Sequence, residues 1–129
     1  MSENPINSSI SHAGKVVASE IDRLEALLAA VPGDLALPQL RALVAIAAEP
    51  GISVNELALR IDVPQQSASR YVSVLLGRYQ DPMGGAPTRI LAEQRISEED
   101  PRRRALFLTL EGTALLATIV HAAFGGLQQ

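Results

Sequence analysis

The chain has 129 residues, of which 47% are hydrophobic and 3% aromatic, so its apolar content is aliphatic. This length fits one domain with a modest core, and no apolar run approaches the roughly 18 residues that a membrane-spanning helix needs. The absence of Cys excludes disulfides, thiolate zinc sites and a cysteine nucleophile. The polar, acidic first residues argue against a signal peptide, so we expect a cytoplasmic protein.

The net charge of −3 is an average over two unlike parts. Residues 64–104 hold seven Arg and five acidic residues, a balance of +2, whereas the rest of the chain holds four basic and nine acidic residues, a balance of −5. Arg is well suited to forked contacts with phosphates and guanine edges. On charge alone, an acidic protein with a solvated Arg-rich patch is an equally good interpretation.

The first part of the chain predicts a flexible N-terminal arm and two helices. Residues 1–10 are polar and lack apolar periodicity, which is typical of an arm. An apolar stripe at spacings of three and four then predicts an amphipathic helix over residues 11–31. A second helix is expected from Pro38, because proline suits a first helical turn. The stripe of the first helix consists of Val17, Ile21, Leu24 and Leu28.

A short helix and a longer one follow with almost no connection between them. Ser53 and Glu56 have the spacing of a capping box, which predicts a helix over residues 54–61. Pro64 opens the next helix, which should end near Leu76. This helix has a buried face and a polar face that contains amides, hydroxyls and one Arg but no acid. An ordinary solvated face would carry Glu and Lys pairs, so this surface is suited to hydrogen-bonding edges. The face expected to be buried consists of Ala68, Val72, Leu75 and Leu76.

The last third predicts a hairpin and a final helix. Alternation over residues 89–96 indicates a strand, a charged turn follows, and residues 105–108 form a second strand. Thr109 should cap the last helix, which carries no charge from Ala114 to Phe124. Because a helix that is apolar all round is normally buried on several sides, we expect it to meet a partner chain.

The pair of helices at 54–61 and 64–76 has the lengths and tight connection of a helix-turn-helix. Its second helix would enter the major groove of DNA, where Gln pairs with adenine and Arg with guanine. A hairpin with Arg at its tip can place a guanidinium in the minor groove. The residues expected to contact DNA on this helix are Pro64, Gln65, Gln66, Ser67, Ser69, Arg70 and Ser73.

Residues 35–116 resemble the MarR family of winged helix-turn-helix regulators in two ordered parts. The first is Glu56-Leu57-Ala58 followed by Val63, Ser67, Ser69-Arg70, Val72 and Leu75, which resembles the positioning and recognition helices of the family. The second is Asp100 and Arg102 followed by Leu108-Thr109 and Gly112, which resembles the Asp-x-Arg wing turn and the Leu-Thr-x-x-Gly helix start. This chain departs from the pattern at Pro101, where the family often has another Arg, and in its longer loop over residues 77–89.

The resemblance implies a mainly α (α+β) fold, a winged helix-turn-helix with terminal dimerisation helices and a two-stranded β-hairpin wing. It implies one domain over residues 11–129, in which residues 11–31 and 110–125 dimerise and residues 38–108 bind DNA. In the family the wing Asp orients the wing Arg, so Asp100 would hold Arg102 for the minor groove. The wing residues expected at DNA are Asp100, Arg102, Arg103 and Arg104. The expected dimer interface consists of Val17, Ile21, Leu24, Leu28, Leu115, Ile119 and Phe124.

Other polar residues have weaker interpretations. Possible phosphate contacts are Ser53, Arg60, Tyr71 and Arg78, although Ser53 is also a helix cap and Tyr71 also suits partial burial. His12 and His121 are isolated, so no metal site is expected. No catalytic constellation is present in the sequence, and we expect neither enzymatic activity nor a cofactor. A small-molecule effector is common in the family but has no support from these residues.

The resulting hypothesis is a homodimeric transcriptional regulator, a repressor that reads a short inverted repeat in double-stranded DNA. Two alternatives are open: a winged-helix module for protein–protein interaction, and an accessory protein that binds DNA without regulating transcription.

Overall fold

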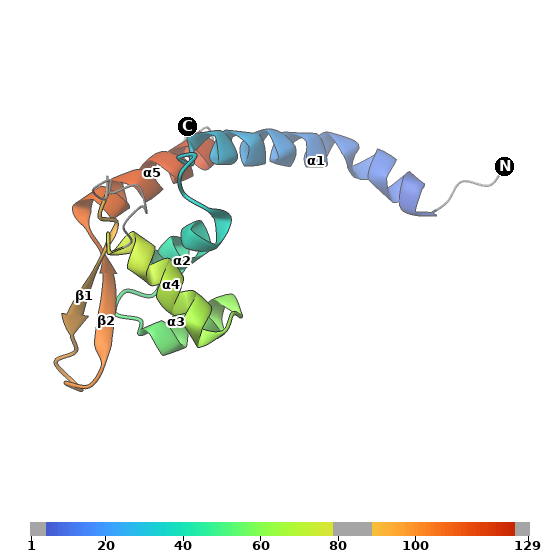
Figure 1. Cartoon of the computed structure of the whole chain (residues 1–129). Coiled ribbons are helices and arrows are strands. Elements are labelled where there is room, and N and C mark those ends of the chain that lie inside the picture. The colour runs from blue at the N-terminus through green and yellow to red at the C-terminus, as the bar shows by residue number, and fades with distance from the viewer. Residues whose placement is uncertain (1–4, 79–88, 126–129) are drawn as a thin grey trace. The chain divides into compact units, whose positions relative to one another are not determined.

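The structure is a computed structural model that describes the backbone of residues 5–78 and 89–125 and the side chains of residues 18–78 and 89–125. Within these ranges it has five helices and a two-stranded antiparallel sheet, so the expected mainly α fold with a hairpin is confirmed (Figure 1). Two compact units are present, residues 33–117 and the two chain ends (1–32 with 118–129). The elements are α1 (Pro5–Ala30), α2 (Leu37–Ala48), α3 (Val54–Ile61), α4 (Gln65–Leu75), β1 (Ala92–Ile96), β2 (Arg104–Leu108) and α5 (Leu110–Phe124).

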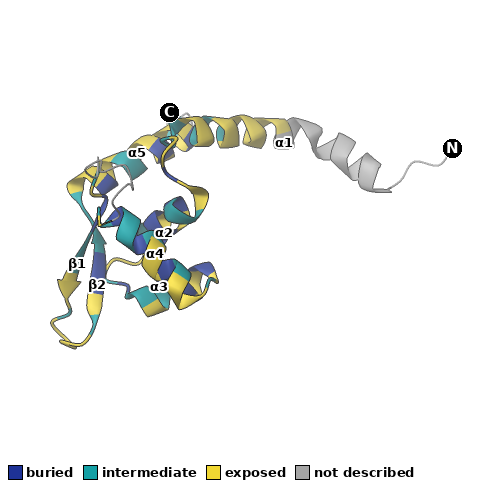
Figure 2. Ribbon diagram, in the orientation of Figure 1, coloured by how far each residue is buried: buried dark blue, intermediate teal, exposed yellow. Residues whose placement is uncertain are grey.

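The core of the unit 33–117 is an aliphatic cluster between α2, α3, α4 and the base of the hairpin (Figure 2). Each helix turns one apolar stripe to this centre, which removes that surface from water and stabilises the fold. The aliphatic composition therefore supplies a packed interior with no aromatic side chain at its centre. The largest fully buried side chains are Leu43, Ile46, Ile52, Leu57, Leu75 and Leu106.

The capping box of α3 is confirmed. The Ser53 hydroxyl accepts a hydrogen bond from the Glu56 amide at 3.2 Å, and the Glu56 carboxylate accepts one from the Ser53 amide at 3.2 Å. After α3, Asp62 takes a left-handed conformation with φ of 57°, which reverses the chain within two residues of α4. The short connection fixes α3 and α4 as a helix-turn-helix pair.

The hairpin is attached to the helical part of the unit through the middle of β2 and through Leu91, the residue before β1. Ile52, in the loop before α3, bridges to Leu106 of β2, and the Gly51 amide donates to the Leu106 carbonyl at 2.7 Å. The strand expected from Arg89 begins only at Ala92. The reason is that the backbone groups of Leu91 are used elsewhere: its amide donates to Leu75 at the end of α4, and its carbonyl accepts from Thr109.

Thr109 begins α5 as expected. Its hydroxyl accepts from the Gly112 amide at 3.0 Å and donates to the Ile90 carbonyl at 2.6 Å. Gly112 is buried and lies against the backbone of Leu91, where an added Cβ would stand 2.0 Å from the Leu91 carbonyl oxygen. The Leu-Thr-x-x-Gly sequence is thus needed for α5 to start against the hairpin.

Helix α1 corrects the expected N-terminal arm. The helix begins at Pro5, so residues 5–10 are helical and not a flexible arm; residues 1–4 lie outside the described part. Proline suits the first helical turn. Extension of an existing helix costs far less than nucleation of a new one, so even a polar stretch can continue a helix.

No helix of the described residues is both long enough and apolar enough to cross a membrane.

Candidate nucleic-acid interface

Helix α4 separates into an anchored face and a polar face. Ala68, Val72 and Leu75 are buried, as expected, while Leu76 at the C-cap is only half-buried because the helix ends there. On the polar side, side chains that carry hydrogen-bond donors and acceptors lie in solvent. Exposed are Pro64, Gln65, Gln66, Ser69 and Arg70, and half-buried are Ser67 and Ser73.

The amide and guanidinium groups on the polar face of α4 make no side-chain interactions within the described structure. Within residues 18–78 and 89–125, no hydrogen bond or ion pair engages the side chains of Gln65, Gln66 or Arg70. Their donors and acceptors are open to an external partner, and no acidic residue of α4 repels a phosphate. This is the arrangement that major-groove recognition requires.

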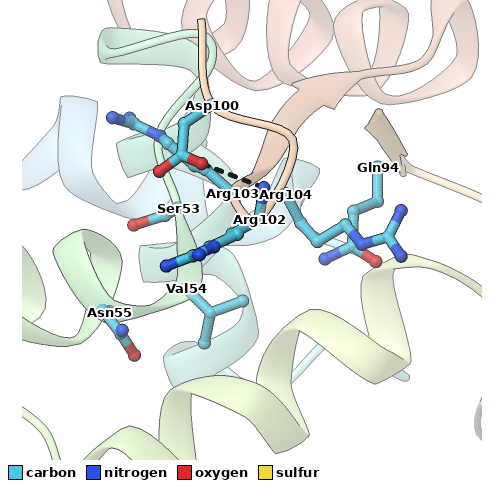
Figure 3. Close-up of a pocket in the computed structure, with 8 residues that line it drawn as sticks. All are labelled: Ser53, Val54, Asn55, Gln94, Asp100, Arg102, Arg103 and Arg104. Carbon is cyan, nitrogen blue, oxygen red and sulfur yellow. Dashed lines mark hydrogen bonds between the residues drawn. The ribbon is translucent and has the colours of Figure 1, made fainter. Parts of the chain in front are cut away.

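A polar hollow of about 340 Å³ lies between the start of α3 and the wing, the hairpin of residues 92–108 (Figure 3). Arg102 and Arg104 are exposed, and their guanidinium groups point to different sides of it. In Figure 3, Arg102 points toward Val54 at the start of α3, and Arg104 lies beside Gln94 of β1. The hollow is lined by Ser53, Val54, Asn55, Gln94, Asp100, Arg102, Arg103 and Arg104.

Asp100 organises the wing turn through the backbone. One of its carboxylate oxygens accepts from the Arg102 amide at 3.0 Å, and its carbonyl accepts from the Arg103 amide at 2.9 Å. The resemblance implied that Asp100 would hold the Arg102 side chain. In the structure it fixes the turn from which that side chain extends, and the guanidinium itself is open to solvent.

Of the three Arg side chains at residues 102–104, that of Arg103 has partners inside the described chain. One terminal nitrogen donates to the Gly51 carbonyl at 3.0 Å and pairs with the Glu56 carboxylate at 2.5 Å. Hydrogen bonds from Ser53, first from its side chain and then from its backbone, lower the pKa of Glu56, and the positive charge of Arg103 lowers it further. Glu56 is thus ionised at neutral pH and attracts the Arg103 guanidinium.

The possible phosphate contacts have diverse settings. Ser53 uses its hydroxyl in the capping box, and Tyr71 is half-buried. Arg78 is exposed and its guanidinium lies 3.4 Å from the Gln94 amide oxygen, which joins the end of α4 to the wing. Arg60 is exposed and lines an apolar groove of about 330 Å³ between α2 and α3.

Sequence reasoning missed three residues of this surface. Asn55 and Gln94 line the hollow beside the Arg side chains, and Glu56 was expected only as a cap residue. Asn55 follows the capping Ser53 by two positions, which places it at the exposed start of a helix and was a usable signal. The sequence around Gln94 contains no such signal, because the position of Gln94 beside Arg104 depends on the pairing of β1 with β2.

The expected dimer residues divide into exposed and buried ones. Ile21, Leu24 and Leu28 of α1 are 56%, 54% and 54% exposed, and Phe124 is 45% exposed. Leu115 is half-buried, and the side chain of Val17 lies outside the described residues. Ile119 is a correction: it is 3% exposed in the single chain, so its apolar surface is already removed from water and is not available to a partner.

In the part of the chain that the structure describes, no group of three or more His, Cys, Asp or Glu side chains is placed to hold a metal ion.

The helix-turn-helix segment and the fold both have known counterparts. Residues 34–78 match the model of the MarR family. The matched segment contains α2, α3 and α4, so the MarR resemblance is confirmed there. No curated protein matches the chain.

Solved structures extend the MarR likeness to the whole fold. RV1404 from Mycobacterium tuberculosis has a TM-score of 0.71 at 15% identity, over 98% of this chain and 79% of that one. A MarR transcriptional regulator from Methanosarcina mazei Go1 has a TM-score of 0.56 at 18% identity, over 93% and 75%. The S. aureus MepR–DNA complex has a TM-score of 0.59 at 18% identity, over 97% and 87%. The fold is therefore that of MarR winged-helix structures, with β1 and β2 as the wing.

Proposed function

We propose that this chain is a sequence-specific double-stranded DNA-binding regulator of transcription that acts as a homodimer on a short inverted repeat. The observation that carries the proposal is the acid-free polar face of α4, whose Gln65, Gln66 and Arg70 side chains have no partner among the described residues, beside a wing turn with Arg102 and Arg104 exposed. Helix α4 would read the major groove, and the wing would reach the minor groove. MepR, which shares this fold, is seen in complex with DNA.

The homodimer is supported by the exposed apolar stripe of α1. A soluble monomer gains nothing from three large aliphatic side chains in water at helical spacing, whereas a second copy would bury them. Two copies related by a two-fold axis present two α4 helices, which fits two half-sites about one DNA turn, ~34 Å, apart. Such a dimer on a promoter would exclude polymerase, so repression is the expected sign of regulation.

The proposal is for a binding protein without catalysis, cofactor or metal, and it names no effector ligand. The test is selection of bound sequences from random duplex DNA by the full chain. We expect an enriched inverted repeat. Weak, sequence-indifferent binding would instead favour an accessory DNA-binding protein. If no DNA is retained by the protein even at low salt, both the regulator and the accessory DNA-binding protein are excluded, since phosphate contacts strengthen as salt falls. The protein–protein interaction module would then be the remaining hypothesis.

A further inference from the structure

The wing turn is held together internally at Arg103. Its backbone amide donates to the Asp100 carbonyl at 2.9 Å, and its carbonyl accepts from the Ser97 amide at 2.9 Å. These bonds tie the start and the middle of the turn to Arg103 at its end, so the turn moves with Arg103. A two-stranded ribbon is at best marginally stable by itself, and what fixes Arg103 therefore also fixes the tip of the wing.

The Arg103 side chain leaves the wing and binds the helix-turn-helix segment. It reaches the Gly51 carbonyl, 52 residues away in the chain, and the Glu56 carboxylate in the first turn of α3. The backbone bridge from Ile52 to Leu106 fastens the middle of β2, and Arg78 contacts Gln94 in the middle of β1. Arg103 adds an attachment nearer the tip, which prevents the hairpin from swinging about these contacts.

Glu56 is the fixed end of this attachment. Its carboxylate also accepts from the Ser53 amide at 3.2 Å, so the group that pairs with Arg103 is itself held by the α3 capping box. The side chains of Arg103 and Glu56 are 40% and 44% exposed. The pair is thus partly open to water, and we expect it to matter for geometry more than for overall stability.

We propose that Arg103 is a positioning residue, not a DNA contact: its ion pair with Glu56 fixes the wing on the start of α3 and so sets where Arg102 and Arg104 meet DNA. This inference rests on the proposed DNA-binding function. Arg102 and Arg104 flank Arg103 in sequence, so a rotation of the tip would displace both guanidinium groups relative to α4. A displacement of this kind weakens contacts to DNA without removing any of the contacting groups.

The substitution Glu56→Gln separates positioning from simple electrostatics. Gln keeps the capping box, in which Glu and Gln are both accepted at this position, and removes only the charge that attracts Arg103. Removal of a negative charge from a DNA-binding surface should by itself strengthen the binding of DNA. If Glu56 positions the wing through Arg103, the same substitution should weaken the binding of DNA. The two explanations therefore predict opposite changes in affinity.

The experiment measures affinity for the selected duplex, at several salt concentrations, for Glu56→Gln, Arg103→Gln, their double variant and two controls. The control Glu99→Gln removes a charge from an exposed wing residue whose carboxylate makes no hydrogen bond or ion pair in the described structure. The control Arg102→Gln removes an exposed guanidinium of the same turn. The contacts that attach the wing to Gly51, Ile52 and Glu56 are called the junction. Hydrogen exchange of the Gly51 and Leu106 amides, measured without DNA, reports whether the junction is intact.

We expect Glu56→Gln to weaken binding about three- to tenfold, whereas Glu99→Gln binds as well as the parent or better. The double variant should be no weaker than Arg103→Gln alone, because the two residues act as one pair. Arg103→Gln should keep the parental salt dependence, whereas Arg102→Gln should lower its slope by about one. Exchange at Gly51 and Leu106 should accelerate in both junction variants.

Tighter binding by Glu56→Gln, additive effects in the double variant, or a reduced salt slope for Arg103→Gln would each overturn the positioning role. A parent that binds no duplex would overturn the proposed function instead. In that case unchanged exchange at Gly51 and Leu106 in the variants would refute the junction as well, and accelerated exchange would retain it.

Discussion

Gly112 lies so close to the hairpin backbone that its lack of a side chain is a structural requirement. A Cβ there would stand 2.0 Å from the Leu91 carbonyl oxygen, far inside contact distance, and the obstacle is backbone that cannot rotate away. At the same scale, the Arg side chains differ in whether they have partners inside the chain. The side chains of Arg70 and Arg102 have no internal partner in the described structure, whereas that of Arg103 has two.

The substitution Gly112→Ala should destabilise the fold by roughly 1–3 kcal/mol or more, because an overpacked site must displace its neighbours. Chemical denaturation monitored by circular dichroism measures this change. The matched control is Gly33→Ala, since nothing lies within 4 Å of the Cβ that it adds. Equal stability of the two variants would refute the close packing of α5 on Leu91.

The substitution Arg70→Ala should weaken binding to the selected duplex by about 1–3 kcal/mol and relax the preference at one base pair, because the proposed forked contact to guanine would be lost. Arg102→Ala should weaken binding evenly across sequences. Repeated selection with each variant measures both effects. Parental binding by both variants would contradict the placement of α4 and the wing on DNA.

At the scale of elements, the carboxylate of Glu56 links α3 to the wing through its ion pair with Arg103. Its pKa is lowered from the ordinary 4.5 by Ser53 and Arg103. A group whose pKa is lower in the folded state stabilises the fold above its unfolded pKa, and this contribution is lost as the pH falls through the folded value.

The parent should therefore lose stability relative to Glu56→Gln as the pH falls from about 6 to about 3, because only the parent protonates at this position. Asp34, whose pKa is also lowered, chiefly by its hydrogen bond with Arg89, is present in both chains and cancels in the comparison. Denaturation at each pH gives the free energies of unfolding. A constant difference across this range would show that the carboxylate does not stabilise the fold.

Helix α1 presents an apolar stripe to solvent, which predicts that α1 packs against a second copy of the chain. The substitution Leu24→Glu should convert the proposed dimer to monomer, because the charge would have to be buried in the interface. Sedimentation velocity over a range of protein concentrations measures this. Ser19→Glu adds the same charge, by helical spacing on the other side of α1, and should leave the dimer intact. A dimer that survives Leu24→Glu would exclude the stripe from the interface.

At the scale of the whole molecule, the proposed homodimer would bring two copies of α4 to DNA together. The distance between them would then be a property of the dimer, and the DNA would have to match it. Insertion of about five base pairs between the half-sites rotates one of them to the opposite side of the duplex and should abolish tight binding, whereas insertion of about ten should restore part of it. Affinity measurements on duplexes of each spacing test this. Equal affinity at all spacings would mean that each chain binds alone.

The fold was largely predictable because its signals are local. The Ser53–Glu56 capping box, the apolar spacing of α4 and the Thr109 cap each act within one helical turn, and each is found where the sequence predicted it. The start of β1 was not, because Leu91 gives its backbone bonds to α4 and α5. The start of α1 was missed because polar residues can extend a helix that is already nucleated.

By itself the sequence determined the helix-turn-helix, the hairpin, the segregation of Arg into residues 64–104 and the polar face of α4, since all of these follow from spacing along the chain. Only the tertiary structure decided which Arg is open to a partner. Arg102, Arg103 and Arg104 are equivalent as sequence neighbours, yet Arg103 alone of the three meets Gly51 and Glu56 in the described structure. That distinction depends on groups about fifty residues away, which come within hydrogen-bond distance only after the hairpin has packed on α3.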